Sequence, residues 1–218
     1  MRRLIAVGVL ALVVVILGVA QLVLPGIAAQ RLRDQLGRSG QVLSVQVHAV
    51  PAIELLWHHA DKVVIRLGRY RTPMAKLGSS LRQSGSVGSL LVTAGEVDAG
   101  LLKLHDATLV KRGARLTASA TVTEADLRAA LPILQSVTPV TSAAGQLTLQ
   151  GTAGLFGVTA RVDATVAAVN GQLVVSPDVP LGGFATLTVF ANPHVEVQSV
   201  GASAVAGGFA VHGTATVR

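Results

Sequence analysis

The sequence predicts an α+β fold that is mostly β: a long curved antiparallel sheet or open barrel around a helix, with an N-terminal membrane helix. Three observations lead to this prediction. Runs rich in Val and Thr alternate between apolar and polar positions along most of the chain, which favours strands. Helical patterns are few and short. An apolar run of 21 residues, Leu4–Leu24, lies near the start of the chain, and its length is typical of a membrane-spanning helix.

The first segment, residues 1–25, is predicted to be a transmembrane anchor or a signal sequence. Gln21 is the one polar side chain in the apolar run, and a helix of this length spans a hydrocarbon core of about 30 Å. Arg2 and Arg3 precede the run, so the positive-inside rule keeps them cytoplasmic. The small residues of Gly26–Ala28 also fit a cleavage site. Under either interpretation the domain is exported. An uncleaved anchor makes the chain a single-pass protein of the cell membrane, with its domain on the extracytoplasmic (periplasmic) side.

The second segment, residues 26–40, is predicted to form a membrane-proximal helix that ends at Gly37–Gly40. Ile27, Leu32 and Leu36 form an apolar stripe at helical spacing. We expect this stripe to pack on the domain or to lie along the membrane surface. Residues 41–218 then form the β-rich domain, which is long enough to bury a core of its own.

Alternating patterns within the domain predict its strands in order. The predicted strands are Val42–Val50, Lys62–Leu67, Leu90–Ala94, Leu101–Val110, Leu116–Val122, Gly145–Thr152, Val158–Val169, Gln172–Val175, Phe184–Ala191, Val195–Val200 and Phe209–Val217. Asn170-Gly171 lies between two of them and is a strong signal for a tight hairpin. A weak helical pattern covers Arg71–Leu81. The domain is therefore expected to consist of long strands with few helices.

The stretch Thr121–Pro132 brings two of the scarce carboxylates, Glu124 and Asp126, close together. Paired carboxylates serve as an acid and a base in some enzymes. Thr123, however, precedes Asp126 by three residues, which is close to a capping box at a helix start. Glu124 then lies in the first turn, where a negative charge complements the helix dipole. The pattern favours a short helix with Leu127 on its apolar face, and no catalytic pair.

Other chemical patterns give no active site. The chain has no cysteine, which excludes disulfides, thiolate metal sites and cysteine nucleophiles. The adjacent pair His58-His59 would point to opposite faces of a strand, so we expect no metal site. Neither a nucleophile elbow nor a phosphate-binding fingerprint is present. We therefore predict that the protein is not an enzyme, has no catalytic residue and needs no cofactor.

Basic residues gather between Asp61 and Arg82. One interpretation is an ordinary solvated face. The other is a patch that meets anionic headgroups, to which each basic residue near a membrane surface contributes about 1 kcal/mol. Nucleic acid is not the expected partner, because the chain is exported and the cluster has one aromatic residue, Tyr70, whereas stacking platforms need several.

The segment "VDAGLLKLHDATLVKRGARLTASATVTEADLRAALP" (Val97–Pro132) and the later "VNGQLVV" follow an N-terminal anchor and an apolar helix. In this order they resemble the LmeA-like phospholipid-binding family of actinobacterial envelope proteins. The resemblance covers roughly residues 37–218. It implies a fold similar to tubular lipid-binding proteins, with a long curved sheet around a helix and an apolar groove for acyl chains. Its motifs are structural, so no catalytic residue carries over.

Together these observations predict a membrane-anchored lipid-binding protein that acts in envelope lipid transport or maturation, with a phospholipid or glycolipid and the membrane as partners. An acyl chain would fill a core of small residues that packs poorly alone. The alternative is a non-enzymatic envelope scaffold that binds an unidentified membrane enzyme or transporter. Trp57 fits a core or a membrane interface equally well. The headgroup contacts are predicted to be Arg66, Arg69 and Arg71. The apolar lining is predicted to be Ile53, Leu55, Trp57, Leu127, Leu131, Leu134, Leu155, Phe156, Phe184 and Phe190.

Overall fold

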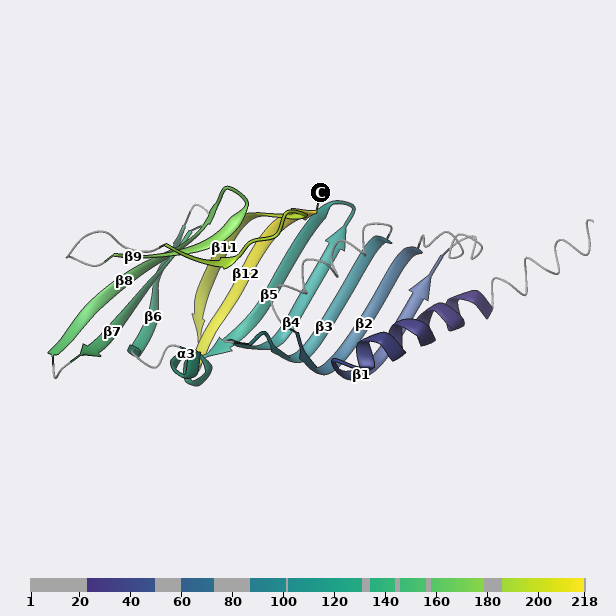
Figure 1. The fold of residues 1–218 in the computed structure, drawn as a ribbon, viewed down its shortest axis with the longest axis horizontal. Helices are drawn as coiled ribbons and strands as arrows, with labels where there is room; N and C mark the ends of the chain where they lie inside the picture. Colours follow the sequence, from purple (N-terminus) through teal and green to yellow (C-terminus); the bar gives the residue numbers. More distant parts are fainter. Residues whose placement is uncertain are drawn as a thin grey trace, which may run out of the picture.

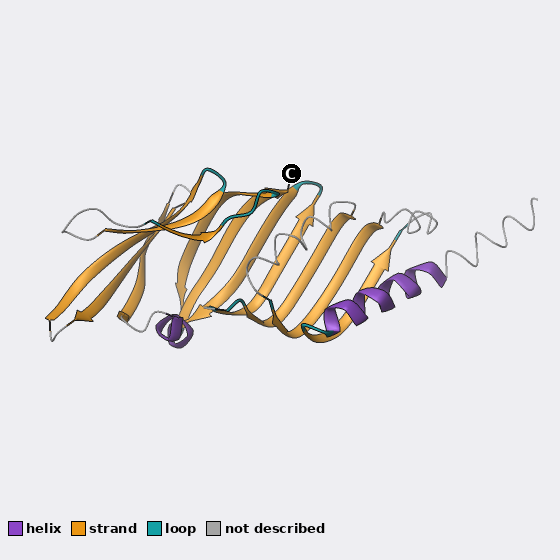
Figure 2. Cartoon of the chain, in the orientation of Figure 1, coloured by secondary structure: helices purple, strands orange, loops and turns teal. Residues whose placement is uncertain are grey.

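A computed structural model describes residues 23–49, 60–72, 87–100, 102–130, 134–143, 146–155, 158–178 and 186–217. Within these residues the chain is mostly β, as the sequence predicted. It forms a seven-stranded sheet, here called the long sheet, and a five-stranded sheet, here called the short sheet (Figure 1). A helix over residues 23–37 lies against one end of the long sheet, and the short sheet lies at the other end (Figure 2).

The long sheet has the strand order β1-β2-β3-β4-β5-β12-β11. Its strands are β1 Gly40–His48, β2 Ala60–Arg71, β3 Val87–Asp98, β4 Lys103–Arg112, β5 Arg115–Thr123, β11 Val195–Val205 and β12 Gly208–Val217. Because β1 and β11 each pair with one neighbour, the sheet stays open. Of the two shapes that the sequence predicted, the structure therefore has the open sheet.

One strand pair departs from the predicted antiparallel order. β2 runs parallel to β3, with Val63 beside Leu90 and Ile65 beside Val92, whereas all other neighbouring pairs within the two sheets are antiparallel. A parallel pair requires a crossover connection. The sequence between these strands includes most of the predicted helix Arg71–Leu81, whose residues 73–81 lie outside the described residues.

The short sheet has the strand order β10-β9-β8-β7-β6. Its strands are β6 Leu134–Ala143, β7 Gln146–Leu155, β8 Val158–Val169, β9 Gln172–Asp178 and β10 Leu187–Phe190. β8 and β9 form the hairpin that Asn170-Gly171 predicted, and both turn residues have positive φ, 50° and 77°, as a tight primed turn requires. Each predicted strand overlaps an observed one.

β6 was not predicted from the sequence. It contains Pro139, which has no N–H to donate to a neighbouring strand. A proline is tolerated in a strand at the edge of a sheet, and β6 is an edge strand of the short sheet. Pro139 therefore lowers the strand propensity of this segment, but it is compatible with the position of β6 at the edge of the sheet.

The helix over residues 23–37 covers most of the segment predicted to be helical, residues 26–40, and ends at Gly37. Its proximity to a membrane remains a prediction. Ala28, Ala29, Leu32 and Leu36 pack against the buried residues of β1, β2 and β3. Leu32 and Leu36 of the predicted stripe thus pack on the domain, whereas Ile27, its third member, is exposed. No helix among the described residues has both the length and the apolar character needed to cross a bilayer. Residues 1–22, which hold most of the predicted span, lie outside the described part of the chain.

Two apolar clusters hold the fold together. The larger joins the helix to the long sheet through residues such as Val45, Ile65 and Leu90. The smaller joins the two sheets, where Ala202 of β11 packs with Leu147 of β7 and Val166 of β8. Both clusters lie on the same face of the long sheet, which we call its inner face. The opposite face is called its outer face.

Candidate functional site

The inner face of the long sheet is apolar along a row that crosses the strands. Paired residues in neighbouring strands point to the same face, so the register defines the row. It runs through Val45, Ile65, Val92, Leu109, Ala118, Gly213 and Val200. Seven strands therefore present one continuous apolar surface, assembled from residues more than 150 positions apart in the sequence.

Burial along this surface is uneven. Near the helix, Val45 and Ile65 are buried, and near the short sheet Ala202 is buried. Between these two covered ends, Ala118 is exposed and Leu109 and Ala120 are half-buried. The middle of the inner face is thus a strip of accessible apolar residues on β4 and β5, two of which are alanines. We call it the central strip, defined by Leu109, Ala118 and Ala120.

Lys111 is a charged residue on the largely apolar inner face. It pairs laterally with Leu90 and Leu116 and is 2% exposed. Its Nζ donates a hydrogen bond to the carbonyl oxygen of Val87 at 2.7 Å. Burial lowers the pKa of its ammonium group, because the charged form loses solvation. Sequence reasoning missed this residue, since it lies beside Arg112 in an apparently exposed turn.

The start of helix α3, Glu124–Ala130, confirms the capping interpretation of the two carboxylates. The backbone N–H of Asp126 donates to Thr123 Oγ1 at 3.1 Å, and the Thr123 hydroxyl donates to the Asp126 carboxylate. His105 on β4 adds a contact that the sequence did not suggest, with Nε2 2.8 Å from Asp126 Oδ2. The hydrogen bond from Thr123, followed by that from His105, lowers the pKa of Asp126. These contacts give Asp126 a structural role at the start of α3.

The predicted apolar lining is described only in part. Leu127 in α3 and Phe190 at the end of β10 are half-buried, while Leu134 and Leu155 begin β6 and end β7. The predicted residues that lie outside the described part of the chain are Ile53, Leu55, Trp57, Leu131, Phe156 and Phe184. Their role in a lining remains a prediction. The inner-face residues of β2 to β5 were not predicted as a lining, although their alternation was the signal that could have identified them.

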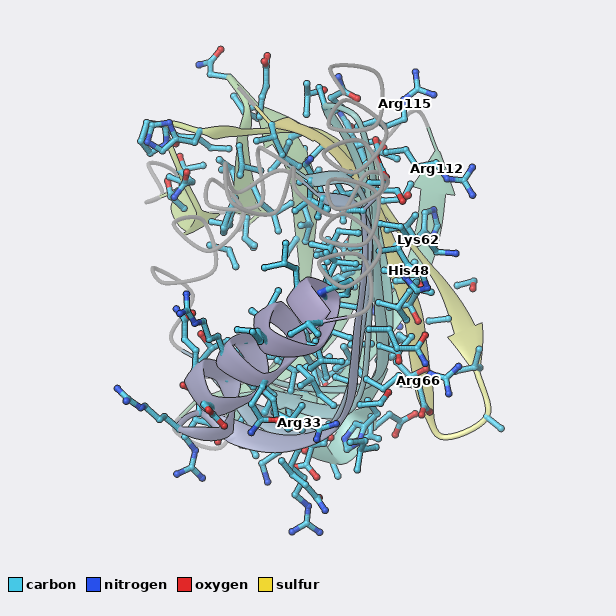
Figure 3. All side chains as sticks on the ribbon, turned by 90° about the vertical axis from the view of Figure 1, so that its right-hand side faces the viewer. Arg33, His48, Lys62, Arg66, Arg112 and Arg115 are labelled. Carbon is cyan, nitrogen blue, oxygen red and sulfur yellow. The ribbon has the colours of Figure 1, made fainter. Side chains whose placement is uncertain are left out.

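The predicted headgroup residues Arg66, Arg69 and Arg71 all lie on β2. Arg66 is exposed and projects from the outer face, away from the helix (Figure 3). Arg69 Nε lies 3.6 Å from the Glu96 carboxylate, and Arg71 Nε lies 3.0 Å from that of Asp98. The backbone N–H of Gly100 and then the Arg71 guanidinium lower the pKa of Asp98. Two of the three arginines therefore already have carboxylate partners, and their contact with a headgroup remains a prediction.

The described residues hold no group of three or more His, Asp or Glu side chains placed to bind a metal ion. Among known proteins, the family described as LmeA-like phospholipid-binding matches residues 17–210. The match covers the helix, the short sheet and the long sheet apart from most of β12. No curated protein and no solved structure matches the chain.

Proposed function

The chain belongs to the LmeA-like phospholipid-binding family, and we propose that it binds the acyl chains of a phospholipid or glycolipid on the central strip of the inner face. The observation that supports this proposal most directly is the exposed Ala118 between two half-buried apolar neighbours, Leu109 and Ala120. A lipid chain gains most free energy by leaving water where it can cover exposed apolar surface, and such surface lies between the two covered ends.

The energetics favour an acyl chain as the occupant. Each buried methylene contributes about 0.8 kcal/mol, so a chain of palmitoyl length retains several kcal/mol after the cost of ordering it. Small side chains at Ala118 and Gly213 leave room above the sheet for such a chain. An acyl chain has no hydrogen-bonding groups, so the surface needs no polar side chains along its length to bind one.

We further propose that Leu4–Leu24 anchors the protein in the cell membrane, with the domain outside the cytoplasm. Two arginines before the run support this orientation, because the positive-inside rule keeps them on the cytoplasmic side. In this arrangement the protein binds envelope lipids without altering them covalently, and serves in their transport or maturation.

Two adjacent residues on opposite faces of β5 provide the test. Ala118→Asp places a charge on the central strip, whereas Ser119→Asp places the same charge on the outer face. Both positions are exposed, so both variants are expected to fold. The full chain is purified in mild detergent, and bound phospholipid is measured by native mass spectrometry and by extraction.

We expect the wild type and Ser119→Asp to carry phospholipid, and Ala118→Asp to lose most of it, because a carboxylate is costly to desolvate against an acyl chain. Equal lipid content in all three proteins would refute the central strip as the binding surface. A wild type without any lipid would refute lipid binding and favour the scaffold alternative.

A further inference from the structure

The outer face of the long sheet carries a row of cationic side chains. The register places His48 beside Lys62, Lys62 beside Ser89, Ser89 beside Arg112, and Arg112 beside Arg115. All except the half-buried Ser89 are exposed. Figure 3 shows the four basic residues projecting from the face opposite the helix. Neighbouring strands lie about 4.8 Å apart, so the row from β1 to β5 spans about 19 Å.

The two arginines at the end of this basic row face each other directly. Arg112 and Arg115 are a cross-strand pair that flanks the β4–β5 turn. Like charges in this position destabilise a sheet unless an anion lies between or above them. Together with Val110, Ala114 and Thr117 they border a shallow depression of about 600 Å³. The arrangement fits an anionic group such as a phosphate, which arginine binds through paired N–H donors.

The positive charge of the row is not neutralised within the described residues. The ion pairs on β2 involve Arg69 and Arg71, at the opposite end of the strand from Lys62. Lys62, Arg66, Arg112 and Arg115 take part in no ion pair in the described part of the chain. These four residues therefore leave a net positive surface that attracts anions.

Apolar side chains lie among these cations. Val64, Leu91 and Val110 form the next cross-strand row on the outer face, and all three are half-buried. Lys62 and Arg66 flank Val64 on β2. A surface that combines accessible apolar groups with cations that form no ion pair among the described residues matches the boundary between lipid headgroups and acyl chains. A purely polyanionic partner would gain nothing from the apolar row.

We propose that the outer face docks on an anionic membrane surface, with Lys62, Arg66, Arg112 and Arg115 contacting lipid phosphates. Each such residue contributes about 1 kcal/mol near an anionic leaflet, so four contacts are sufficient to orient an already tethered domain. This docking goes beyond the proposed acyl-chain site, because it uses the other face of the sheet. One face lies on the bilayer while the other remains available for a lipid.

The absence of cysteine allows the docking to be measured in the full chain. Gln46→Cys places a single fluorophore on the outer face of β1, and Thr188→Cys places one on β10 of the short sheet; both positions are exposed. Each protein is reconstituted in nanodiscs of phosphatidylcholine alone or with phosphatidylglycerol as about one third of the lipid. A quencher attached to the lipid headgroups reports how close each fluorophore lies to the bilayer.

We expect quenching at position 46 to rise roughly threefold or more in the anionic discs, and to fall again in high salt. Quenching at position 188 should not depend on lipid charge. Arg112→Glu combined with Arg115→Glu should abolish the rise at position 46. The matched control is Arg161→Glu, an exposed charge reversal on β8 of the short sheet, which should leave the rise intact.

Three results would overturn the proposal: equal quenching at position 46 in both kinds of disc, an equal loss in the Arg161→Glu control, or binding of polyglutamate at position 46 in preference to the anionic discs. The last would identify an acidic protein as the partner. Bound phospholipid, measured on the same samples, separates the two proposals. Ala118→Asp should lose lipid and keep docking, whereas the double arginine variant should keep lipid and lose docking.

Discussion

The two faces of the long sheet are built from the same strands and have opposite chemistry. On β2, Val63, Ile65 and Leu67 face the helix and are buried, while Lys62 and Arg66 face outward and are exposed. Because successive side chains in a strand point to opposite faces, two residues that are adjacent in the sequence lie in completely different environments. Adjacent residues therefore form natural pairs of test and control, and the first two comparisons below use such pairs.

The largest expected difference is between Ile65 and Arg66. Ile65→Ala leaves a cavity in the cluster that joins helix and sheet, and we expect it to lower the free energy of unfolding by about 2–4 kcal/mol. Arg66→Ala should change it by less than about 0.5 kcal/mol. Urea unfolding of the full chain in mild detergent measures both. Similar effects at the two positions would mean that the inner face does not carry the stability of the sheet.

Lys111 and Arg112 give the next comparison. The buried ammonium of Lys111 has one hydrogen bond, to the carbonyl oxygen of Val87, and replacing a desolvated charge by an apolar side chain is often stabilising. We expect Lys111→Met to raise the free energy of unfolding by about 1 kcal/mol at neutral pH. Arg112→Met, on the exposed face, should leave it nearly unchanged. A clear loss of stability in Lys111→Met would show that the ammonium group is needed to hold β3 against β4.

Lys111 also predicts a dependence on pH. Its pKa in the folded protein is lowered from the ordinary 10.5, so the unfolded chain binds this proton more tightly. The cost of the buried charge is fully present below the folded pKa and disappears as pH rises from that value toward 10.5. The wild type should therefore gain stability over this range relative to Lys111→Met. Parallel curves for the two proteins would contradict the prediction.

An effect of similar size is expected at the end of β5, where this strand meets α3. Thr123→Ala removes the N-cap hydroxyl and should cost about 1 kcal/mol. It should also reduce the sensitivity to acid, because Thr123 is the main cause of the lowered pKa of Asp126. The stabilising contribution of Asp126 is present above its unfolded pKa of 3.8 and is lost as pH falls through the lower folded value. Acid titration followed by circular dichroism tests this; Thr123→Ser, which keeps the hydroxyl, is the control.

The smallest effect is expected at the exposed ion pair between Arg71 and Asp98. Arg71→Ala should lower the free energy of unfolding by less than about 1 kcal/mol, because the arginine side chain is 83% exposed. High salt should reduce the difference further. A large and salt-independent loss would show that this exposed pair has a structural role.

The sequence predicted local features well. Alternation located the strands of the long sheet, Asn170-Gly171 located the β8–β9 hairpin, and the spacing of Thr123 and Asp126 located the start of α3. Each of these signals is carried by residues a few positions apart. β6 was missed because Pro139 lowers strand propensity, and only the position of the strand at a sheet edge explains why the proline is tolerated.

The candidate sites were harder to predict. The basic cluster of the sequence, between Asp61 and Arg82, contributes Lys62 and Arg66 to the outer face, but Arg69 and Arg71 have carboxylate partners on β3. Arg112 and Arg115 lie about fifty residues away in the sequence and reach the same row through the strand register. The burial of Lys111 was likewise not predictable from the sequence, because it depends on the residues that the fold brings over this side chain.

The sequence by itself determined that this chain forms long strands, that one side of each strand is apolar, and that the chain resembles a phospholipid-binding family. The first two properties follow from composition and from the alternation of neighbouring side chains, which are local, and the resemblance rests on the motifs in Val97–Pro132 and "VNGQLVV". Only the tertiary structure decided that β2 lies parallel to β3, that the apolar sides join into one inner face with an accessible central strip, and that Lys62, Arg112 and Arg115 form one row. The physical reason is that strand pairing and register join residues far apart in the chain. Apart from tight hairpins such as the one at Asn170-Gly171, no local pattern encodes which strand lies beside which.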